Sequence, residues 1–318
     1  MQRSCLVGLI LVAVLLMVAS LALRSCLVPP EATSAIEAPT PTEPAPPEAD
    51  PPTPEPTLPT PAPVLVDHRL YAERIEGLHL ETVRPLADVE IEVRGLAATD
   101  DAFYVTAYDS NTGLAWLHEI DRASRAVLRS LPLDEPERGE PCGLHAAGDI
   151  LWTCLSTADR AEVLGIHRGA WEITYRVPLQ GSLAVVAQID EARLMGMDRA
   201  GQRIYIWGGD LRLQRTATHG SGAVYSDCEV LRGSLFCAGM GPDGAVLDVI
   251  DPSSLSLLTR HRATTRTLWG VYVASNGLAF DGQGFLLAPA GGELPLVWTY
   301  RLDGIALPDY VPSTRPPQ

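Results

Sequence analysis

The chain has 318 residues, of which 46% are hydrophobic and 20% charged, and its formal net charge is −15. From Asp67 to the C-terminus, 22 arginines stand against 33 acidic residues, so this region is acidic by itself. An acidic surface repels phosphate backbones, which argues against a nucleic-acid-binding protein.

Residues 1–27 are expected to form a membrane anchor or a signal segment. An uncharged, mostly aliphatic run covers residues 5–23, between Arg3 and Arg24. As a helix it spans about 28 Å, close to the hydrocarbon thickness of a bilayer. The flanking charges favour a single pass with the N-terminus in the cytoplasm and the C-terminal domain outside. The alternatives are a cleaved signal peptide, which gives a secreted protein, and a lipid anchor at Cys26.

Residues 28–66 are expected to form a disordered, proline-rich stalk. Residues 29–63 contain 14 prolines, six acidic residues and no basic residue. Such a stretch has almost no apolar surface to bury, and proline biases it towards extended polyproline II. At about 3.1 Å per residue, it reaches on the order of 100 Å. The globular domain is then residues 67–312, followed by a disordered tail at 313–318.

Tryptophans and Pro-Leu dipeptides mark an internal repeat. Trp116, Trp207 and Trp298 stand 91 residues apart, and Pro-Leu recurs from position 85 to 132 to 178, at steps of 47 and 46. Both series indicate a unit of about 45 residues, which with several short strands per unit is typical of a β-propeller blade. We therefore expect an all-β fold, a five-bladed β-propeller, with six blades as the alternative.

The predicted strands follow this repeat along the chain. In the first unit they lie around Leu96 and at 103–108, 114–120 and 126–133, separated by turn-forming clusters. The next units cover 142–179, 183–219 and 227–263, and the unit at 183–219 is the least regular. The last unit has strands near 277–280, 285–288 and 295–302 and lacks an outer strand. Residues 78–86 end like the other outer strands, so we expect an N-terminal strand to close the ring.

Four cysteines of the globular domain form two closely spaced pairs. Cys228 and Cys237 flank Arg232-Gly233 symmetrically, so a two-residue hairpin places them opposite each other. Cys142 and Cys154 bracket Gly148-Asp149 and need a slightly longer turn. Since an exported domain keeps such bridges, we expect the disulfides Cys142–Cys154 and Cys228–Cys237. Free buried thiols and a zinc site are the alternatives, although the C-x₂-C spacing of structural zinc is absent from the sequence.

Two stretches resemble known propeller repeats. The run from Phe103 to Leu133 looks like the repeats of YVTN-type propellers. The run SNGLAFDGQGFLLAPA at 275–290 resembles the strand pairs of NHL-repeat and gluconolactonase-like (SMP-30-type) propellers. Gluconolactonase-like enzymes hold a divalent metal at the channel mouth with Glu, Asn and Asp side chains. The resemblance implies that Asp227 and Asn276 bind Ca²⁺ or another divalent metal in a lactonase or esterase-type hydrolase.

Candidate binding residues come from the expected position of the central channel. The first strand of every blade lines that channel, and ligands usually meet the loops at one of its mouths. Aligning the units places three polar residues just before such strands and two slightly inside them. These five ligand-binding candidates are Arg94, Asp227 and Asn276, followed by His145 and Glu229.

The sequence contains no nucleophile elbow, zinc-binding helix, Walker loop or dinucleotide fingerprint. We therefore expect a membrane-tethered extracytoplasmic propeller that is non-catalytic, needs no cofactor and binds a protein, peptide or glycan of the cell envelope or the extracellular space. The metal-dependent hydrolase is the alternative. The count of five units also suggests a relative of the plant-type glutaminyl cyclases, whose catalytic glutamate has no assigned counterpart in this chain.

Overall fold

The computed structural model describes residues 75–76, 78–133, 139–200, 203–262, 275–281, 284–289 and 295–301. The chain divides into two units, residues 1–63 and 64–318, and every described residue belongs to the second unit. The expected anchor at 1–27, the stalk at 28–66 and the tail at 313–318 therefore lie outside the described residues. Within the described ranges, no helix is long and apolar enough to cross a membrane.

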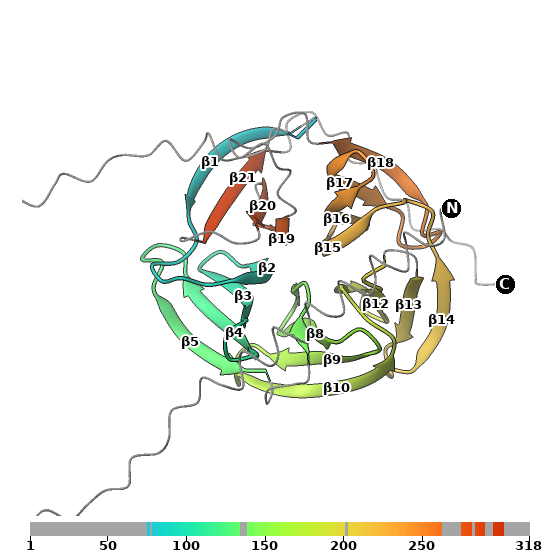
Figure 1. Ribbon diagram of the computed structural model, residues 1–318, viewed down its shortest axis with the longest axis horizontal. Helices are drawn as coiled ribbons and strands as arrows, with labels where there is room; N and C mark the ends of the chain where they lie inside the picture. Colours follow the sequence, from blue (N-terminus) through green and yellow to red (C-terminus); the bar gives the residue numbers. More distant parts are fainter. Residues whose placement is uncertain are drawn as a thin grey trace, which may run out of the picture. The chain divides into compact units, whose positions relative to one another are not determined.

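The described residues form five antiparallel sheets around a common axis, four of four strands and one of five (Figure 1). Sheet I comprises β2 (Val93–Ala98), β3 (Ala102–Asp109), β4 (Leu114–Asp121) and β5 (Val127–Pro132). Sheet II comprises β6 (Glu140–Pro141), β7 (His145–Ala147), β8 (Ile150–Ser156), β9 (Arg160–His167) and β10 (Glu172–Gln180). Sheet III comprises β11 (Val185–Asp190), β12 (Arg193–Met197), β13 (Arg203–Gly208) and β14 (Leu213–Thr218). Sheet IV comprises β15 (Val224–Leu231), β16 (Ser234–Gly241), β17 (Gly244–Ile250) and β18 (Leu257–Arg262).

Sheet V joins β19 (Ser275–Phe280), β20 (Gly284–Pro289) and β21 (Leu296–Arg301) to the N-terminal strand β1 (His79–Pro85). The inner strands contact one another around the axis, β2 with β7, β7 with β11, β11 with β15, β15 with β19 and β19 with β2. Strands β1, β5, β10, β14 and β18 form the rim (Figure 1). This arrangement confirms the all-β propeller fold expected from the repeat.

The repeat markers occupy corresponding strands. Trp116, Trp207 and Trp298 lie on β4, β13 and β21, the third strands of sheets I, III and V. The prolines of the Pro-Leu series lie on β1, β5 and β10 at the rim. Outermost strands tolerate a residue without an N–H donor, which explains why proline recurs there.

The closing strand predicted at residues 78–86 is confirmed. Strand β1 pairs antiparallel with β21, with Val83 opposite Trp298 and Pro85 opposite Leu296. Just before β1, Ile75 is 8% exposed and packs in a buried cluster with residues of sheet IV, and the Glu76 N–H donates to the Arg262 carbonyl over 2.8 Å. The segment that completes sheet V therefore also holds it to sheet IV.

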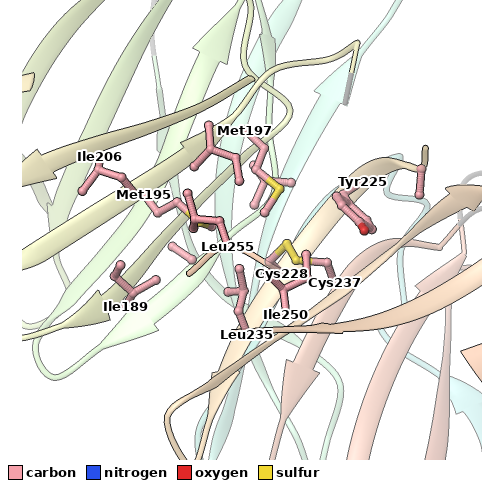
Figure 2. Close-up of a cluster of buried hydrophobic side chains, with 14 of the residues drawn as sticks. Ile189, Met195, Met197, Ile206, Tyr225, Cys228, Leu235, Cys237, Ile250 and Leu255 are labelled. Carbon is pink, nitrogen blue, oxygen red and sulfur yellow. A yellow bond between two sulfur atoms is a disulfide. The ribbon is translucent and has the colours of Figure 1, made fainter. Parts of the chain in front are cut away.

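Apolar side chains fill the space between neighbouring sheets. Figure 2 shows the cluster between sheets III and IV, where side chains of β11, β12 and β13 face those of β15, β16 and β17. The labelled members are Ile189, Met195, Met197, Ile206, Tyr225, Cys228, Leu235, Cys237, Ile250 and Leu255. Burial of such side chains contributes about 1.5–3 kcal/mol each, so packing between neighbouring sheets stabilises the ring.

Both predicted disulfides, Cys142–Cys154 and Cys228–Cys237, are present. Cys228 lies directly opposite Cys237 in the β15–β16 pair. The two turn residues, Arg232 and Gly233, have φ angles of 49° and 75°, which a two-residue hairpin turn requires. The sequence pattern and the turn chemistry therefore agree at this hairpin.

The unit at 183–219, whose sequence pattern is the least regular, contains the four strands of sheet III. Strands β12 and β13 are buried on both faces, so their sequences lack the polar alternation that marks a half-exposed strand. The interrupted inner strand belongs instead to sheet II, where β6 and β7 both pair with β8. Between β6 and β7, the Gly143 N–H donates to the carbonyl of Ala184, just before β11, over 3.1 Å. This N–H therefore takes no part in the pairing with β8.

Candidate functional site

The centre of the ring holds one fully buried carboxylate, that of Asp227 on β15. Its Oδ1 accepts the N–H groups of Leu144 and Cys228 at 3.1 and 3.0 Å. Its Oδ2 accepts those of Leu96 and Leu278 at 3.1 and 3.0 Å. Three of these donors come from sheets I, II and V, so this side chain ties three sheets to sheet IV. A carboxylate has about four lone-pair positions, and here each one has a donor.

A glycine precedes each leucine that reaches the carboxylate from another sheet, at Gly95, Gly143 and Gly277. A Cβ on Gly143 would lie 2.2 Å from Oδ1 of Asp227, and one on Gly95 would lie 2.5 Å from the Leu144 nitrogen. At these two positions only glycine allows the inner strands to approach the axis this closely. The repeated Gly-Leu dipeptide is the sequence signal for this centre, and our sequence analysis did not use it.

The inner strands of sheets I, IV and V share a β-bulge at the same level. The pairing register skips Arg94 in β2, Ser226 in β15 and Asn276 in β19. A bulge leaves one residue out of the ladder and re-aims its neighbours, which explains how the following N–H groups turn towards the axis. Asp227 therefore corresponds to the position after Arg94 and Asn276. The expectation that Arg94, Asp227 and Asn276 stand just before their strands is wrong, because all three lie within β2, β15 and β19. The bulges interrupt the alternating pattern, so the sequence does not show where these strands begin.

Opposing effects act on the pKa of Asp227. Burial raises the pKa of this carboxyl well above its ordinary value. The N–H groups of Leu278, Leu96 and Cys228 act in the opposite direction, and the nearby charge of Glu229 adds to the rise. A carboxyl proton would have to displace one of the four N–H donors, so the hydrogen bonds oppose protonation.

Arg94 and Asn276 lie on one side of the Asp227 level, towards the end of the ring axis where the inner strands begin, which we call the entry end. Arg94 Nη2 lies 2.6 Å from Glu92 Oε1, and the guanidinium lies 5.7 Å from the centroid of the Tyr108 ring. Asn276 Nδ2 donates to the carbonyl of Val93 in the neighbouring inner strand over 3.0 Å. Both side chains therefore interact with neighbouring groups of the protein.

His145 and Glu229 lie on the other side of Asp227, further along β7 and β15. Nδ1 of His145 lies 3.2 Å from Oε1 of Glu229, and the residues are 3% and 9% exposed. The same Oε1 accepts the Val230 N–H at 3.0 Å, while His145 Nδ1 makes no hydrogen bond of good geometry within the described residues. The other four predicted residues thus form two pairs, one on each side of the Asp227 carboxylate.

The expected metal ligands are poorly suited to a metal. Among the described residues, no group of three or more His, Cys, Asp or Glu side chains is placed to hold an ion. Asp227 has no lone pair left to offer, because four N–H groups occupy it. A metal at this position would have to displace hydrogen bonds that join three sheets to sheet IV.

The entry end contains a cavity of about 680 Å³, formed by loops and turns of sheets I, II and III. We call it the entry cavity. Its polar and aromatic lining includes Tyr108, Glu140, Ser182 and Arg199. None of the five predicted binding residues lines it, although Arg94 lies against the Tyr108 ring. Glu140 and Arg199 were not among the predicted residues, because they lie 59 residues apart and belong to no motif.

No protein-family model and no curated protein matches the chain. Among solved structures, a glutaminyl cyclase from Myxococcus xanthus resembles it with a TM-score of 0.54 and 13% identity, covering 70% of this chain and 95% of that one. A protein of unknown function from Bacteroides caccae has a TM-score of 0.47 and 13% identity, covering 67% and 79%. A luciferin-regenerating enzyme has a TM-score of 0.46 and 10% identity, covering 68% and 79%.

These comparisons do not single out the YVTN, NHL or gluconolactonase-like propellers, so that resemblance stays a prediction. At these identities, the likeness shows the fold alone. The chain is therefore similar to known proteins as a β-propeller, and its function has to be argued from its own residues.

Proposed function

We propose that this chain is a membrane-tethered, extracytoplasmic β-propeller that binds a protein, peptide or glycan at its entry end and catalyses no reaction. The observation that carries the proposal is the Asp227 carboxylate, whose four acceptor positions are filled by N–H groups. A catalytic carboxylate needs a free lone pair or a transferable proton that a substrate can reach. Asp227 is 0% exposed and instead supports the ring.

The disulfides support the extracytoplasmic location. Such bridges persist in oxidising compartments and are rare in the cytosol. The aliphatic run at residues 5–23 and the proline-rich stretch after it favour a domain held away from a membrane.

A turnover assay tests the non-catalytic proposal against the metal-dependent hydrolase. The purified chain is incubated with a panel of lactones and carboxylic esters, with and without Ca²⁺, Mg²⁺ and Zn²⁺. We expect no turnover above the buffer rate under any of these conditions. Metal-dependent turnover that disappears in Asn276→Ala, while the unfolding midpoint of that variant stays unchanged, would establish the hydrolase and overturn the proposal.

A second candidate function is intramolecular cyclisation of N-terminal glutamine. It is favoured by the buried Glu229–His145 pair, whose carboxylate oxygen and ring nitrogen lie 3.2 Å apart, and by the fold shared with a glutaminyl cyclase. In such a reaction the α-amine attacks the side-chain amide carbon, the C–N bond to the amide nitrogen breaks, and ammonia leaves. Glu229 is the group suited to move the proton from the amine to the leaving nitrogen.

Ammonia release from a peptide beginning with glutamine tests this candidate. Release that is lost in Glu229→Gln, with the fold retained, would support cyclisation. No release from the wild-type chain would eliminate it.

A further inference from the structure

The entry cavity contains a guanidinium group held in one orientation by the main chain. Arg199 Nε donates to the carbonyl of Leu183 over 3.2 Å, and Nη2 donates to that of Ser156 over 3.4 Å. Its Nη1 donates to Oε2 of Glu140 over 3.3 Å. A guanidinium has five N–H donors, so after these three bonds two have no partner among the described residues and could serve a ligand. The donors are pre-organised, which lowers the entropy lost when a ligand binds.

The pair of Arg199 and Glu140 contributes little to stability. Their side chains are 39% and 38% exposed. An ion pair with this exposure stabilises a protein by about 0–1 kcal/mol, because water screens it. Within the described part of the chain, the second carboxylate oxygen of Glu140 has no hydrogen bond. The pair therefore offers free donors beside a free acceptor.

The chemistry of the cavity lining favours an uncharged ligand. Among the described residues that line it, Arg199 and Glu140 are the only charged ones, and their charges cancel. Each hydroxyl of a vicinal diol both donates and accepts a hydrogen bond, so a diol matches neighbouring N–H donors and a carboxylate acceptor. Ser182, a half-buried residue that also lines the cavity, adds a hydroxyl that can donate and accept.

The shape of the cavity also fits a ring-shaped polyol. Tyr108 lines the cavity, and an aromatic side chain packs well against the C–H groups of a sugar ring. Four other lining positions carry glycine or alanine, namely Gly113, Gly139, Ala158 and Ala200. The volume of about 680 Å³ lies within the range of about 300–1,000 Å³ that is usual for small-molecule sites.

We propose that the entry cavity binds a neutral carbohydrate, with vicinal hydroxyl groups bonded to Arg199 and Glu140 and a sugar ring packed against Tyr108. The inference rests on the proposed ligand-binding function and names the ligand class of that site. A charged ligand is disfavoured because it would leave one member of the Arg199–Glu140 pair facing a like charge.

A glycan array followed by calorimetry tests the inference. The purified full chain, kept in a detergent without a sugar headgroup, is applied to an array of neutral and acidic glycans. We expect binding to neutral glycans, with a Kd that rises at least tenfold in Glu140→Gln and in Arg199→Gln. Arg212→Gln is the matched control, because Arg212 is 87% exposed and lies outside the cavity lining, and its Kd should stay within twofold.

Three results of the glycan-binding experiment would overturn the carbohydrate inference. They are no binding to any neutral glycan at millimolar concentration, equal affinity in the cavity variants and the wild type, and preference for acidic glycans. Peptides selected from a random library that bind the wild type but not Arg199→Gln would also overturn it, while leaving the proposed ligand-binding function intact. Lactone or ester turnover would instead overturn the proposed function itself, so the two failures are distinguishable.

Discussion

Replacing Asp227 by asparagine is the most informative perturbation of the ring centre. Asparagine keeps the shape of the side chain, but its amide oxygen accepts only two of the four N–H groups, and its NH₂ faces the other two. Two buried donors without a partner cost about 1–3 kcal/mol each, or about 2–6 kcal/mol together. Loss of the buried charge removes its desolvation cost, so we expect the lower half of this range, about 2–4 kcal/mol. The side chain is 0% exposed, so solvent does not reduce the effect.

Urea unfolding of the purified chain, followed by tryptophan fluorescence, measures this loss. Asp227→Asn should lower the midpoint at an unchanged m value, which indicates lower stability without a change in compactness. The control is Asp149→Asn, because the side chain of Asp149 is 77% exposed, and its stability should stay within about 0.5 kcal/mol of the wild type. If Asp227→Asn is also within about 0.5 kcal/mol of the wild type, our reasoning about the ring centre is refuted.

Three further predictions concern the disulfides, a strained turn and acid stability. The double variant Cys228→Ala/Cys237→Ala opens a short loop and should lose about 2–3 kcal/mol in urea unfolding, and an unchanged midpoint would contradict this. Arg125 has a φ of 66°, a conformation that glycine adopts without strain. Arg125→Gly should therefore raise the free energy of unfolding by about 0.5–1 kcal/mol, whereas Arg125→Ala should not. Equal urea midpoints for the glycine and alanine variants would refute the strain. Hydrogen bonds from hydroxyl groups of their own turns lower the pKa of Asp109 and Asp121 in the folded protein. The stability that these two carboxylates contribute is therefore fully present above their unfolded pKa of about 4. It is lost as the pH falls through their lower pKa in the folded state. Urea midpoints from pH 6 down to about pH 2 should therefore fall less steeply when both aspartates are alanine, and identical slopes would contradict the assignment.

Features that depend on local sequence could be predicted. The hairpin around Arg232-Gly233 follows from turn chemistry, and it correctly set Cys228 opposite Cys237. The closing strand followed from a shared Pro-Leu ending, because rim strands face the same constraint in every unit. These predictions hold because the repeat places the same physical demand on the same position of each unit.

Apart from the repeated Gly-Leu dipeptide, the sequence carries no signal for the ring centre, because its hydrogen bonds are long-range and use main-chain donors. The donors on Leu96, Leu144 and Leu278 are 131, 83 and 51 residues away from Asp227 in sequence. Every non-proline residue carries an N–H group, so the side-chain pattern does not reveal which ones point to the axis. The bulge at Asn276 also shifts the alignment by one residue, which is why Asp227 was matched to the wrong positions.

Hydrogen exchange at the three leucine amides tests the central claim most directly, namely that Asp227 holds the sheets together. In the wild type, the N–H groups of Leu96, Leu144 and Leu278 should exchange as slowly as that of Val249, which lies inside the ladder of sheet IV. In Asp227→Asn, we expect at least one amide from sheets I, II and V to exchange at least tenfold faster relative to Val249. Rapid exchange of all three amides in the wild type, or protection relative to Val249 that is unchanged in the variant, would contradict the account.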